Sequence, residues 1–335
     1  MDDQTLLKVE NLETRFISGE TIIRAVNDVS FTVKKGKTIG LVGESGSGKS
    51  VTVHSITQLL PPLGKITGGR ITYIKDGKEI VLNKIQKNGK TMRSIRGKEI
   101  GMIFQDPNTS LNPVYTIGNQ VMENIIHHEK VTKKQAAEKA LHILNSLGIP
   151  NVRSRIHEYP HQFSGGMKQR VGIAMSMVGN PKILIADEPT TALDVTIQLQ
   201  ILELMKNIQG EYGTSIIFIT HNLGIVAHMA DEIGVMYMGR IVEYGFTRQV
   251  LTSPKHPYTE ALLQSVPYVG MNKQARLKTI KGNTPDPAAL PEGCTFAPRC
   301  EYATEACNVY PDEFHLGGGH KVSCWLHKER EEQLG

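Results

Sequence analysis

Gly43-Glu44-Ser45-Gly46-Ser47-Gly48-Lys49-Ser50 matches the pattern G-x-x-x-x-G-K-[ST] without a mismatch. An apolar run over residues 37–42 precedes this stretch, and a helical pattern follows it until Pro61-Pro62. Glycines let successive backbone N–H groups turn inward toward an anion, and the N-terminus of the following helix adds positive charge. The sequence therefore predicts a phosphate-binding loop rather than a chance Gly/Ser-rich turn. Lys49 is expected to bind the β- and γ-phosphates, and the Ser50 hydroxyl is expected to ligate Mg²⁺.

A second apolar run, over residues 183–186, ends in the acids Asp187 and Glu188. A helical stretch at about 194–209 and another apolar run at 216–219 follow, which predicts a parallel sheet buried on both faces. Ligands bind at the carboxyl ends of such strands, so Asp187 is expected to hold Mg²⁺ and Glu188 to polarise the attacking water. His221 directly follows the next strand and is expected at the same edge, near the γ-phosphate. The alternatives are an acid pair at the protein surface and a structural histidine.

The remaining chain reads as short strands at 7–10 and 29–33, charged hairpins over 75–98, and mostly helix over 108–178. Within the helical part, Thr132 and Gln135 form a capping box, and Gly148 is expected to end the helix whose apolar face begins at Ala136. From Ser253 onward Pro, Gly and Cys become dense, which predicts a separate, loop-rich C-terminal segment.

Composition excludes several classes of protein. The 335 residues are 39% hydrophobic, so a packed core is expected, and no apolar stretch is long enough to cross a bilayer. The net charge of +5 is mild, and no block of like charges suggests a tail for nucleic acid. The acidic N-terminus lacks the features of a signal peptide. A soluble, intracellular globular protein is therefore expected.

One further stretch carries a resemblance to a known family. Phe163-Ser164-Gly165-Gly166-Met167-Lys168-Gln169-Arg170 resembles the L-S-G-G-Q signature of ABC-type ATPases, with Phe and Met as departures at its edges. Phe16 matches the aromatic residue that stacks on adenine, and Gln105 matches the loop glutamine that reaches Mg²⁺ and the membrane subunit. Thr191-Ala192-Leu193-Asp194 matches the loop that crosses between subunits, and His221 matches the switch histidine.

The resemblance implies an ATPase that works as a dimer. The N–H groups at the start of the signature helix would form a second anion site, which a neighbouring subunit presents to the phosphate loop. ATP would then lie between the two subunits, and cleavage would weaken their closure. The implied catalytic residues are Lys49, Gln105, Glu188 and His221, and the implied Mg²⁺ ligands are Ser50, Gln105 and Asp187. The implied nucleotide-binding residues are Phe16, Gly43, Glu44, Ser45, Gly46, Ser47, Gly48, Lys49, Ser50, Val51, Gln105, Ser164, Gly165, Gly166 and Asp194.

Residues 103–113 and 256–263 resemble the ATP-binding subunits of dipeptide and oligopeptide importers, a subfamily that also contains nickel importers. The implied fold is α/β: a P-loop NTPase domain over 5–255, with an N-terminal antiparallel β-subdomain and a helical subdomain at about 108–178, and a C-terminal extension over 256–335. The implied partners are a second ATPase subunit, two membrane permeases and an external binding protein. The chain would lie at the cytoplasmic face of the membrane, with the helical subdomain on the permeases. The cargo, peptide or nickel, stays open.

All four cysteines, Cys294, Cys300, Cys307 and Cys324, lie in the loop-rich C-terminal segment. In a reducing compartment disulfides are not expected, and four thiolates suit a [4Fe–4S] cluster or structural zinc. The subfamily resemblance favours the cluster. If zinc binds instead, His315, His320 and His327 are possible ligands. Four thiols without a metal are the remaining alternative.

Two other functions conflict with the sequence. ABC-type ATPases that act on nucleic acid usually carry a long insertion, and the interval between Gln105 and Ser164 leaves no room for one. A regulatory module without hydrolysis conflicts with the intact Lys49, Asp187 and Glu188.

Overall fold

The protein is described by a computed structural model that covers residues 4–191, 193–265 and 280–328. The chain divides into two compact units. Unit 1 comprises the beginning of the first strand, Val33–Thr38 and Tyr73–Ile219, and unit 2 comprises Leu7–Thr32, Ile39–Thr72 and the chain from Thr220 onward.

Unit 1 contains a parallel sheet and a group of helices. Its elements are β5 (Lys78–Val81), η1 (Leu82–Lys84), α2 (Lys90–Ile95), β6 (Ile100–Ile103), α3 (Pro107–Ser110), α4 (Ile117–His128), α5 (Lys133–Ser146), α6 (Val152–Arg155), η2 (Pro160–Gln162), α7 (Gly165–Met177), β7 (Ile183–Asp187), α8 (Val195–Tyr212) and β8 (Ser215–Thr220).

Unit 2 contains the strands that surround the phosphate loop and the C-terminal segment. Its elements are β1 (Thr5–Ser18), β2 (Thr21–Lys34), β3 (Thr38–Val42), α1 (Lys49–Ile56), β4 (Gly64–Lys75), α9 (Leu223–Met229), β9 (Glu232–Tyr237), β10 (Arg240–Phe246), α10 (Thr247–Thr252), α11 (Pro257–Gln264), η3 (Ala297–Arg299), η4 (Glu305–Asn308), β11 (Phe314–His315), β12 (Lys321–Val322) and η5 (Trp325–His327). The first residues of β1 and the ends of β2 and β4 belong to unit 1, as does Thr38 of β3, whereas Thr220 at the end of β8 belongs to unit 2.

The sheet of unit 1 confirms the predicted parallel strands. β6, β7 and β8 lie in that order, with Ile103 opposite Ala186 and Asp187 opposite Ile219. Every residue of β7 and β8 is buried, as expected for apolar runs that helices cover on both faces. This arrangement brings the carboxyl ends of the three strands to one edge.

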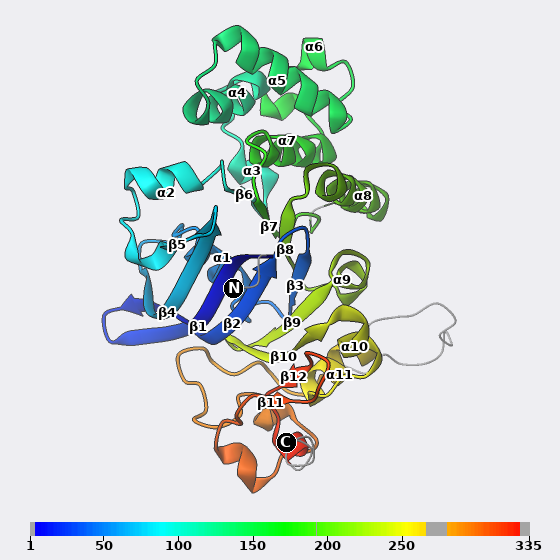
Figure 1. The fold of residues 1–335 in the computed structure, drawn as a ribbon. Helices are drawn as coiled ribbons and strands as arrows, with labels where there is room; N and C mark the ends of the chain where they lie inside the picture. The colour runs from blue at the N-terminus through cyan, green and yellow to red at the C-terminus, as the bar shows by residue number, and fades with distance from the viewer. Residues whose placement is uncertain (1–3, 192, 266–279, 329–335) are drawn as a thin grey trace. The chain divides into compact units, whose positions relative to one another are not determined.

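The helices of unit 1 confirm the predicted helical region, with turns between them. α4, α5 and α7 pack on one another, and Figure 1 shows α6 beside α5. The capping box at Thr132 and Gln135 starts α5, and Ala136 and Ala140 on its apolar face are fully buried. Gly148 follows the helix in a left-handed conformation, as predicted.

Residues 75–98 differ in part from the prediction of solvated hairpins. β4 and β5 do form a hairpin around the Asp76-Gly77 turn, since both turn residues adopt positive φ. The next residues form η1 and α2 instead of a second hairpin. Leu82, Met92 and Ile95 are buried there, so a few apolar side chains fix helical turns within a charged segment.

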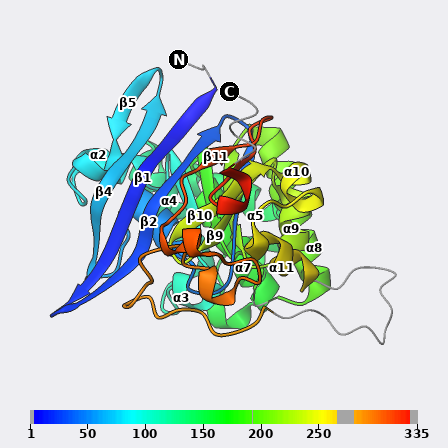
Figure 2. The ribbon, with the colours of Figure 1, turned by 90° about the horizontal axis from the view of Figure 1, so that it is seen from below.

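Unit 2 joins strands from distant parts of the sequence. The strand order is β2-β1-β4 in one sheet and β11-β12-β10-β9-β3 in the other, and Figure 2 shows β1, β2 and β4 running beside one another. β3 pairs in parallel with β9, whereas β9, β10, β12 and β11 pair successively in antiparallel fashion. The predicted strands at 7–10 and 29–33 are therefore confirmed, and both are longer than expected.

The C-terminal segment is part of the core of unit 2. Val322 of β12 pairs with Glu243 of β10, and Phe296 is buried among Tyr237, Tyr258 and other apolar side chains of the core. Figure 1 shows β11 and β12 next to β10. The sequence predicted a separate piece without this strand addition, and the domain boundary at residue 255 stays a prediction. Among the described residues, no helix combines the length and the apolar character needed to cross a membrane.

Candidate functional site

The phosphate loop has the strand–loop–helix context that its sequence predicts. The loop follows β3 and leads into α1, whose first residue is Lys49. Gly43, Gly46 and Gly48 have φ angles of 153°, 80° and 99°, which side chains other than glycine rarely adopt. A Cβ atom on Gly43 would lie 2.1 Å from the carbonyl oxygen of Met236, so glycine is required there by space as well as by φ.

Lys49 is positioned by the loop itself. Its side chain is buried, and its Nζ donates hydrogen bonds to Gly43 O at 2.9 Å, Glu44 O at 2.8 Å and Ser47 Oγ at 3.3 Å. These bonds fix the ammonium group within the loop at the start of α1. The loop and the lysine together form a cradle with the positive charge that phosphate oxygens need.

The turn after β9 supports the loop from behind. Gly239 N donates to Ser47 O at 2.9 Å, and Asn27 N donates to Gly239 O at 2.8 Å. This turn lies close because β3 and β9 are parallel neighbours, so their carboxyl ends are adjacent. The loop is therefore held by residues that are distant from it in the sequence.

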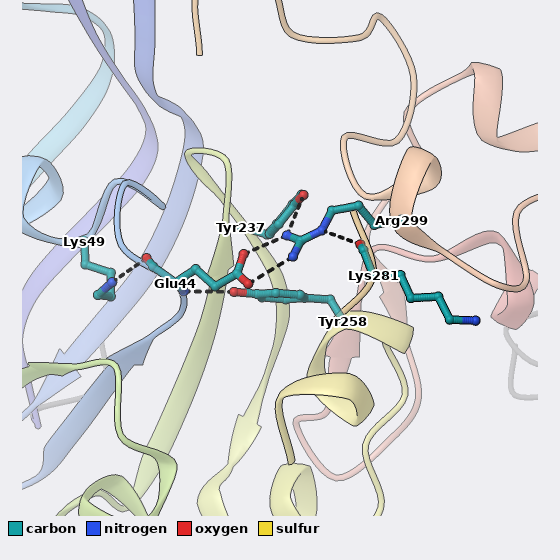
Figure 3. A network of polar contacts seen from close by, with 6 residues as sticks. All are labelled: Glu44, Lys49, Tyr237, Tyr258, Lys281 and Arg299. Atoms are coloured by element: carbon teal, nitrogen blue, oxygen red, sulfur yellow. Dashed lines mark hydrogen bonds and ion pairs between the residues drawn. The ribbon is translucent and has the colours of Figure 1, made fainter. Parts of the chain in front are cut away.

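A contact that the sequence analysis missed holds Glu44. Arg299 Nη1 lies 2.7 Å from Glu44 Oε2 and Arg299 Nη2 lies 3.2 Å from Glu44 Oε1, while the backbone N–H of Glu44 donates to Tyr258 Oη at 2.9 Å (Figure 3). In the sequence, the residues around Tyr258 indicate only a likeness to the subfamily. Nothing in the spacing of the sequence pairs Arg299 with Glu44, because their contact depends on the packing of the C-terminal segment.

In unit 1 the parallel strands bring Gln105 and Glu188 together. Gln105 follows β6 and Glu188 follows β7, and Gln105 Nε2 donates to Glu188 Oε2 at 3.2 Å. Thr191 Oγ1 donates to the same carboxylate oxygen at 2.8 Å, and Glu188 N donates to Ile219 O at 3.0 Å. Glu188 has a φ of 45°, a left-handed conformation in which this turn holds its side chain. Asp187, at the end of β7, is only 3% exposed.

The signature stretch opens a helix, as predicted. Ser164 is the N-cap of α7, and its side chain accepts a hydrogen bond from Met167 N at 3.4 Å. Ser164 and Gly165 are exposed, so the first N–H groups of the helix face the surface of the unit. A Cβ atom on Gly166 would lie 2.8 Å from Ile197 Cγ2, which explains the glycine at that position.

The other predicted residues fall in both units. Asp194 is exposed and caps α8 through a hydrogen bond from Ile197 N at 3.0 Å, whereas Ala192 in the same loop lies outside the described residues. His221 is exposed directly after β8, and Phe16 on β1 is half-buried. A Cβ atom on Gly64 would lie 3.1 Å from the Phe16 ring. The structure thus assembles predicted residues within each unit, and their union in a single nucleotide site stays a prediction.

The four cysteines line one pocket together with Phe296 and Trp325. Burial raises the pKa of the Cys324 thiol to about 11 and also raises the pKa values of Cys294 and Cys300, so metal binding would have to displace protons.

The predicted metal centre is not supported by this arrangement. Across residues 4–191, 193–265 and 280–328, no group of three or more His, Cys, Asp or Glu side chains could hold a metal ion. Two of the histidines proposed as zinc ligands have other partners. His320 Nε2 lies 2.7 Å from Glu243 Oε1, and His327 Nε2 lies 2.8 Å from Lys255 O.

Comparison with known proteins decides the family. The family described as ABC transporter matches residues 26–191, and the family described as oligopeptide/dipeptide transporter, C-terminal region, matches residues 242–307. The dipeptide transport ATP-binding protein DppD of Bacillus subtilis is 48% identical over 98% of this chain and 97% of its own. The chain belongs to the ABC transporter family. The oligopeptide transport ATP-binding protein OppD of Haemophilus influenzae is also similar, at 45% identity over 97% of this chain and 98% of its own.

Solved structures agree with this family assignment. The ATP-binding cassette MJ0796, in a dimeric post-hydrolysis state bound to ADP and Pi, is 28% identical and matches with a TM-score of 0.64. The match covers 72% of this chain and 99% of the cassette. CbiO1 from Clostridium perfringens, part of the ABC transporter complex cbiONQ, matches with a TM-score of 0.62 over 75% of this chain and 92% of its own. The predicted P-loop ATPase fold of this ABC protein is therefore confirmed.

Proposed function

We propose that this chain binds and hydrolyses MgATP to drive the import of dipeptides or oligopeptides through a membrane permease. The observation that carries the proposal is the presence, in one chain, of an ATPase cassette and the oligopeptide/dipeptide transporter C-terminal region. Relatives named for dipeptide and oligopeptide transport align with nearly the full chain.

The proposed chemistry divides among the residues already described. The loop backbone over Gly43–Val51 and the Lys49 ammonium bind the phosphates, and Phe16 stacks on adenine. Ser50, Gln105 and Asp187 would bind Mg²⁺, which would neutralise charge on the phosphates. Glu188 acts as the general base toward the attacking water. The hydrogen bond from Gln105 holds the Glu188 carboxylate in place. His221 stabilises the charge that develops on the γ-phosphate.

A second ATPase subunit would complete the site through the signature helix. Ser164 and Gly165 at the start of α7 are exposed, as is Asp194, and the apolar side chain of Val195 is 72% exposed. Anion-binding N–H groups beside an exposed apolar side chain suit a surface that a partner subunit covers when ATP is bound. The dimeric state of the related cassette supports this arrangement.

The substitution Glu188→Gln tests the proposed chemistry. It keeps the size of the side chain and its place beside Gln105 but removes the base, so we expect hydrolysis to fall by about 10²–10⁴-fold while ATP binding persists. Size-exclusion chromatography with light scattering should show an ATP-dependent dimer, formed with the natural partner ATPase if the two subunits differ. Undiminished turnover in Glu188→Gln would contradict the role of this residue.

The exposed apolar turn between α3 and α4 suits a docking site for the permease. Val114 is 71% exposed and Tyr115 is 54% exposed, both within unit 1. The double substitution Val114→Asp with Tyr115→Asp should lower transport in reconstituted vesicles and leave the ATPase rate of the ATP-binding subunits without the permease unchanged. Phe246→Asp, at a residue that is 52% exposed at the end of β10 in unit 2, is the matched control.

Reconstitution with the permeases and the binding protein also tests the cargo. Stimulation of ATP hydrolysis by a peptide-loaded binding protein would support peptide import. Stimulation by a nickel-loaded binding protein alone would identify the alternative, a nickel importer. DNA- or ribosome-dependent hydrolysis without any permease would contradict both.

The four cysteines carry a second, narrower proposal, a [4Fe–4S] cluster in the pocket they share. The support is that all four thiols line one pocket. Anaerobically purified protein should be brown and contain four irons per chain. Colourless protein with stoichiometric zinc, or with neither metal, would contradict the cluster.

A further inference from the structure

Glu44, the second residue of the phosphate loop, is held at three of its groups. Tyr258 Oη accepts from its amide, its carbonyl accepts from Lys49, and its carboxylate receives the Arg299 guanidinium in a two-pronged pair. Figure 3 shows the carboxylate directed toward Arg299, with Lys49 on the opposite side of Glu44. The carboxylate therefore anchors the loop from outside, while the carbonyl of the same residue helps to position Lys49.

Arg299 is itself fixed by its surroundings. Its side chain is 5% exposed, its Nη1 donates to Tyr237 Oη at 3.3 Å, and its Nε donates to Lys281 O at 3.1 Å. The hydrogen bond to the Glu44 carboxylate raises the pKa of the guanidinium further above its ordinary value. A planar guanidinium with partners on each edge loses little freedom when it binds a carboxylate, which makes this pair stronger than an exposed ion pair.

The pair connects the C-terminal segment to the loop. Arg299 ends η3 and immediately precedes Cys300. The ring of Phe296, three residues earlier, packs 5.3 Å from the Tyr237 ring and 5.4 Å from the Tyr258 ring. The aromatic packing thus seats η3 against the same two tyrosines that contact Arg299 and Glu44.

We propose that Arg299 is a positioning residue for nucleotide binding, which acts through Glu44 to hold the phosphate loop and to neutralise its carboxylate. This inference rests on the proposed function of the chain as an ATPase. Without Arg299, the Glu44 carboxylate would carry an uncompensated negative charge on the second residue of the phosphate loop. The docked C-terminal segment therefore sets the affinity for ATP.

A charge-rescue experiment tests the proposal in the full chain. MgATP affinity is measured by calorimetry for unaltered protein and for Arg299→Ala, Arg299→Lys, Glu44→Gln and the double variant Arg299→Ala with Glu44→Gln. Loss of a charge-assisted pair should weaken MgATP binding in Arg299→Ala by about tenfold. The affinity of Arg299→Lys should lie between those of Arg299→Ala and the unaltered protein. The double variant should bind more tightly than Arg299→Ala, because the uncompensated charge is gone.

Kinetics separate positioning from general damage. In Arg299→Ala the KM for ATP should rise by about tenfold, while kcat at saturating ATP should stay within about twofold. Lys281→Ala is the matched control, because its side chain is 80% exposed and pairs only with Glu301 in the described contacts, while its backbone bond to Arg299 is retained. Tyr258→Phe removes one hydroxyl from the same network and should weaken binding by a smaller factor.

Several outcomes would overturn the inference. Unchanged affinity in a folded Arg299→Ala variant would do so, and so would a double variant as weak as Arg299→Ala. If Arg299→Ala does not fold, unchanged affinity in both Arg299→Lys and Tyr258→Phe has the same meaning. Failure of the unaltered chain to bind MgATP, or undiminished binding in Lys49→Ala, would instead overturn the proposed function.

Discussion

Gln105 Nε2 lies 3.2 Å from Glu188 Oε2, although the two residues are 83 positions apart in the chain. The parallel register that sets Ile103 opposite Ala186 brings the ends of β6 and β7 together, and each residue lies two positions beyond this pair. The amide and the carboxylate are therefore neighbours at one strand edge, and the proposed mechanism assigns Mg²⁺ to the amide and the attacking water to the carboxylate.

The first prediction concerns this pair. Gln105→Ala should lower kcat for ATP by about tenfold or more, because it removes both the Mg²⁺-directed amide and the hydrogen bond that orients Glu188. Affinity for ATP should change little, because the phosphate loop is intact. Steady-state hydrolysis and nucleotide binding measure the two effects. Thr109→Ala, which removes a local hydrogen bond to Asp106 O within α3, is the control in the neighbouring segment. An equal loss of kcat there would show that the whole segment after β6 is sensitive to substitution.

The second prediction concerns space at Gly43. In Gly43→Ala the new Cβ atom would lie 2.1 Å from Met236 O, a backbone atom that cannot move alone. The loop or the turn after β9 must shift, so we expect a loss of stability of about 2–4 kcal/mol and a large loss of ATP affinity. Urea unfolding and calorimetric titration measure these quantities.

Gly77→Ala is the matched control for Gly43→Ala. Gly77 has a φ of 75° with no atom within 4 Å of an added Cβ, so it isolates the cost of the left-handed backbone. For Gly77→Ala we expect a loss of stability of about 1 kcal/mol and unchanged ATP binding. Equal stability losses in the two variants would show that the contact with Met236 O does not matter.

The third prediction concerns acid sensitivity at His256. Burial lowers the pKa of His256 to about 4, and its Nδ1 accepts the N–H of Tyr258 at the start of α11. Glu243 opposes this lowering and His327 adds to it. The unfolded chain binds the proton near pH 6.5, so the stability from neutral His256 is complete above pH 6.5 and is lost progressively toward pH 4. The loss should reach about 3 kcal/mol at pH 4.

His256→Asn removes this titration, since asparagine retains an oxygen for the N-cap. The difference in unfolding free energy between pH 7 and pH 4.5 should therefore become smaller in His256→Asn than in the unaltered protein. His315→Asn, at a side chain that is 61% exposed, is the control. An unchanged pH dependence in His256→Asn would show that other groups govern acid unfolding.

The sequence predicted those parts of the molecule that depend on local patterns. The phosphate loop, the buried strands that end at Asp187 and Thr220, and the capping box at Thr132 each depend on neighbouring residues, and the structure confirms all three. The helix after the loop is an exception. It ends at Ile56, ahead of the predicted stop at Pro61, because the chain leaves the helical conformation at Gln58, whose φ is 51°.

The contacts around Glu44 could not be predicted, because they depend on long-range packing. Arg299 lies 255 positions from Glu44, and only the seating of Phe296 in the core of β9 and β10 brings the guanidinium to the loop. The pairing of β12 with β10 was missed for a related reason. A strand of two residues within a segment rich in Pro and Gly has no periodicity to detect.

The fourth prediction concerns Glu243, which ties the C-terminal segment to β10. This buried carboxyl group accepts hydrogen bonds from Lys255 N at 2.7 Å and His256 N at 2.9 Å, and it lies 2.7 Å from His320 Nε2. Glu243→Ala would leave two backbone N–H groups and a buried imidazole without their acceptor. We therefore expect the free energy of unfolding to fall by about 3–5 kcal/mol.

The loss of stability in Glu243→Ala should be concentrated around Lys255, His256 and His320, which contact the Glu243 carboxylate. Hydrogen exchange should accelerate at residues 254–258 and 319–323 more than in β7 of unit 1, which pairs with β6 and β8. Glu313→Ala is the matched control, because Glu313 is 44% exposed and pairs with Lys321 at the surface, so its removal should cost less than about 1 kcal/mol. A uniform acceleration throughout the chain would contradict a local role for Glu243, because loss of a single anchor should first release the elements it joins.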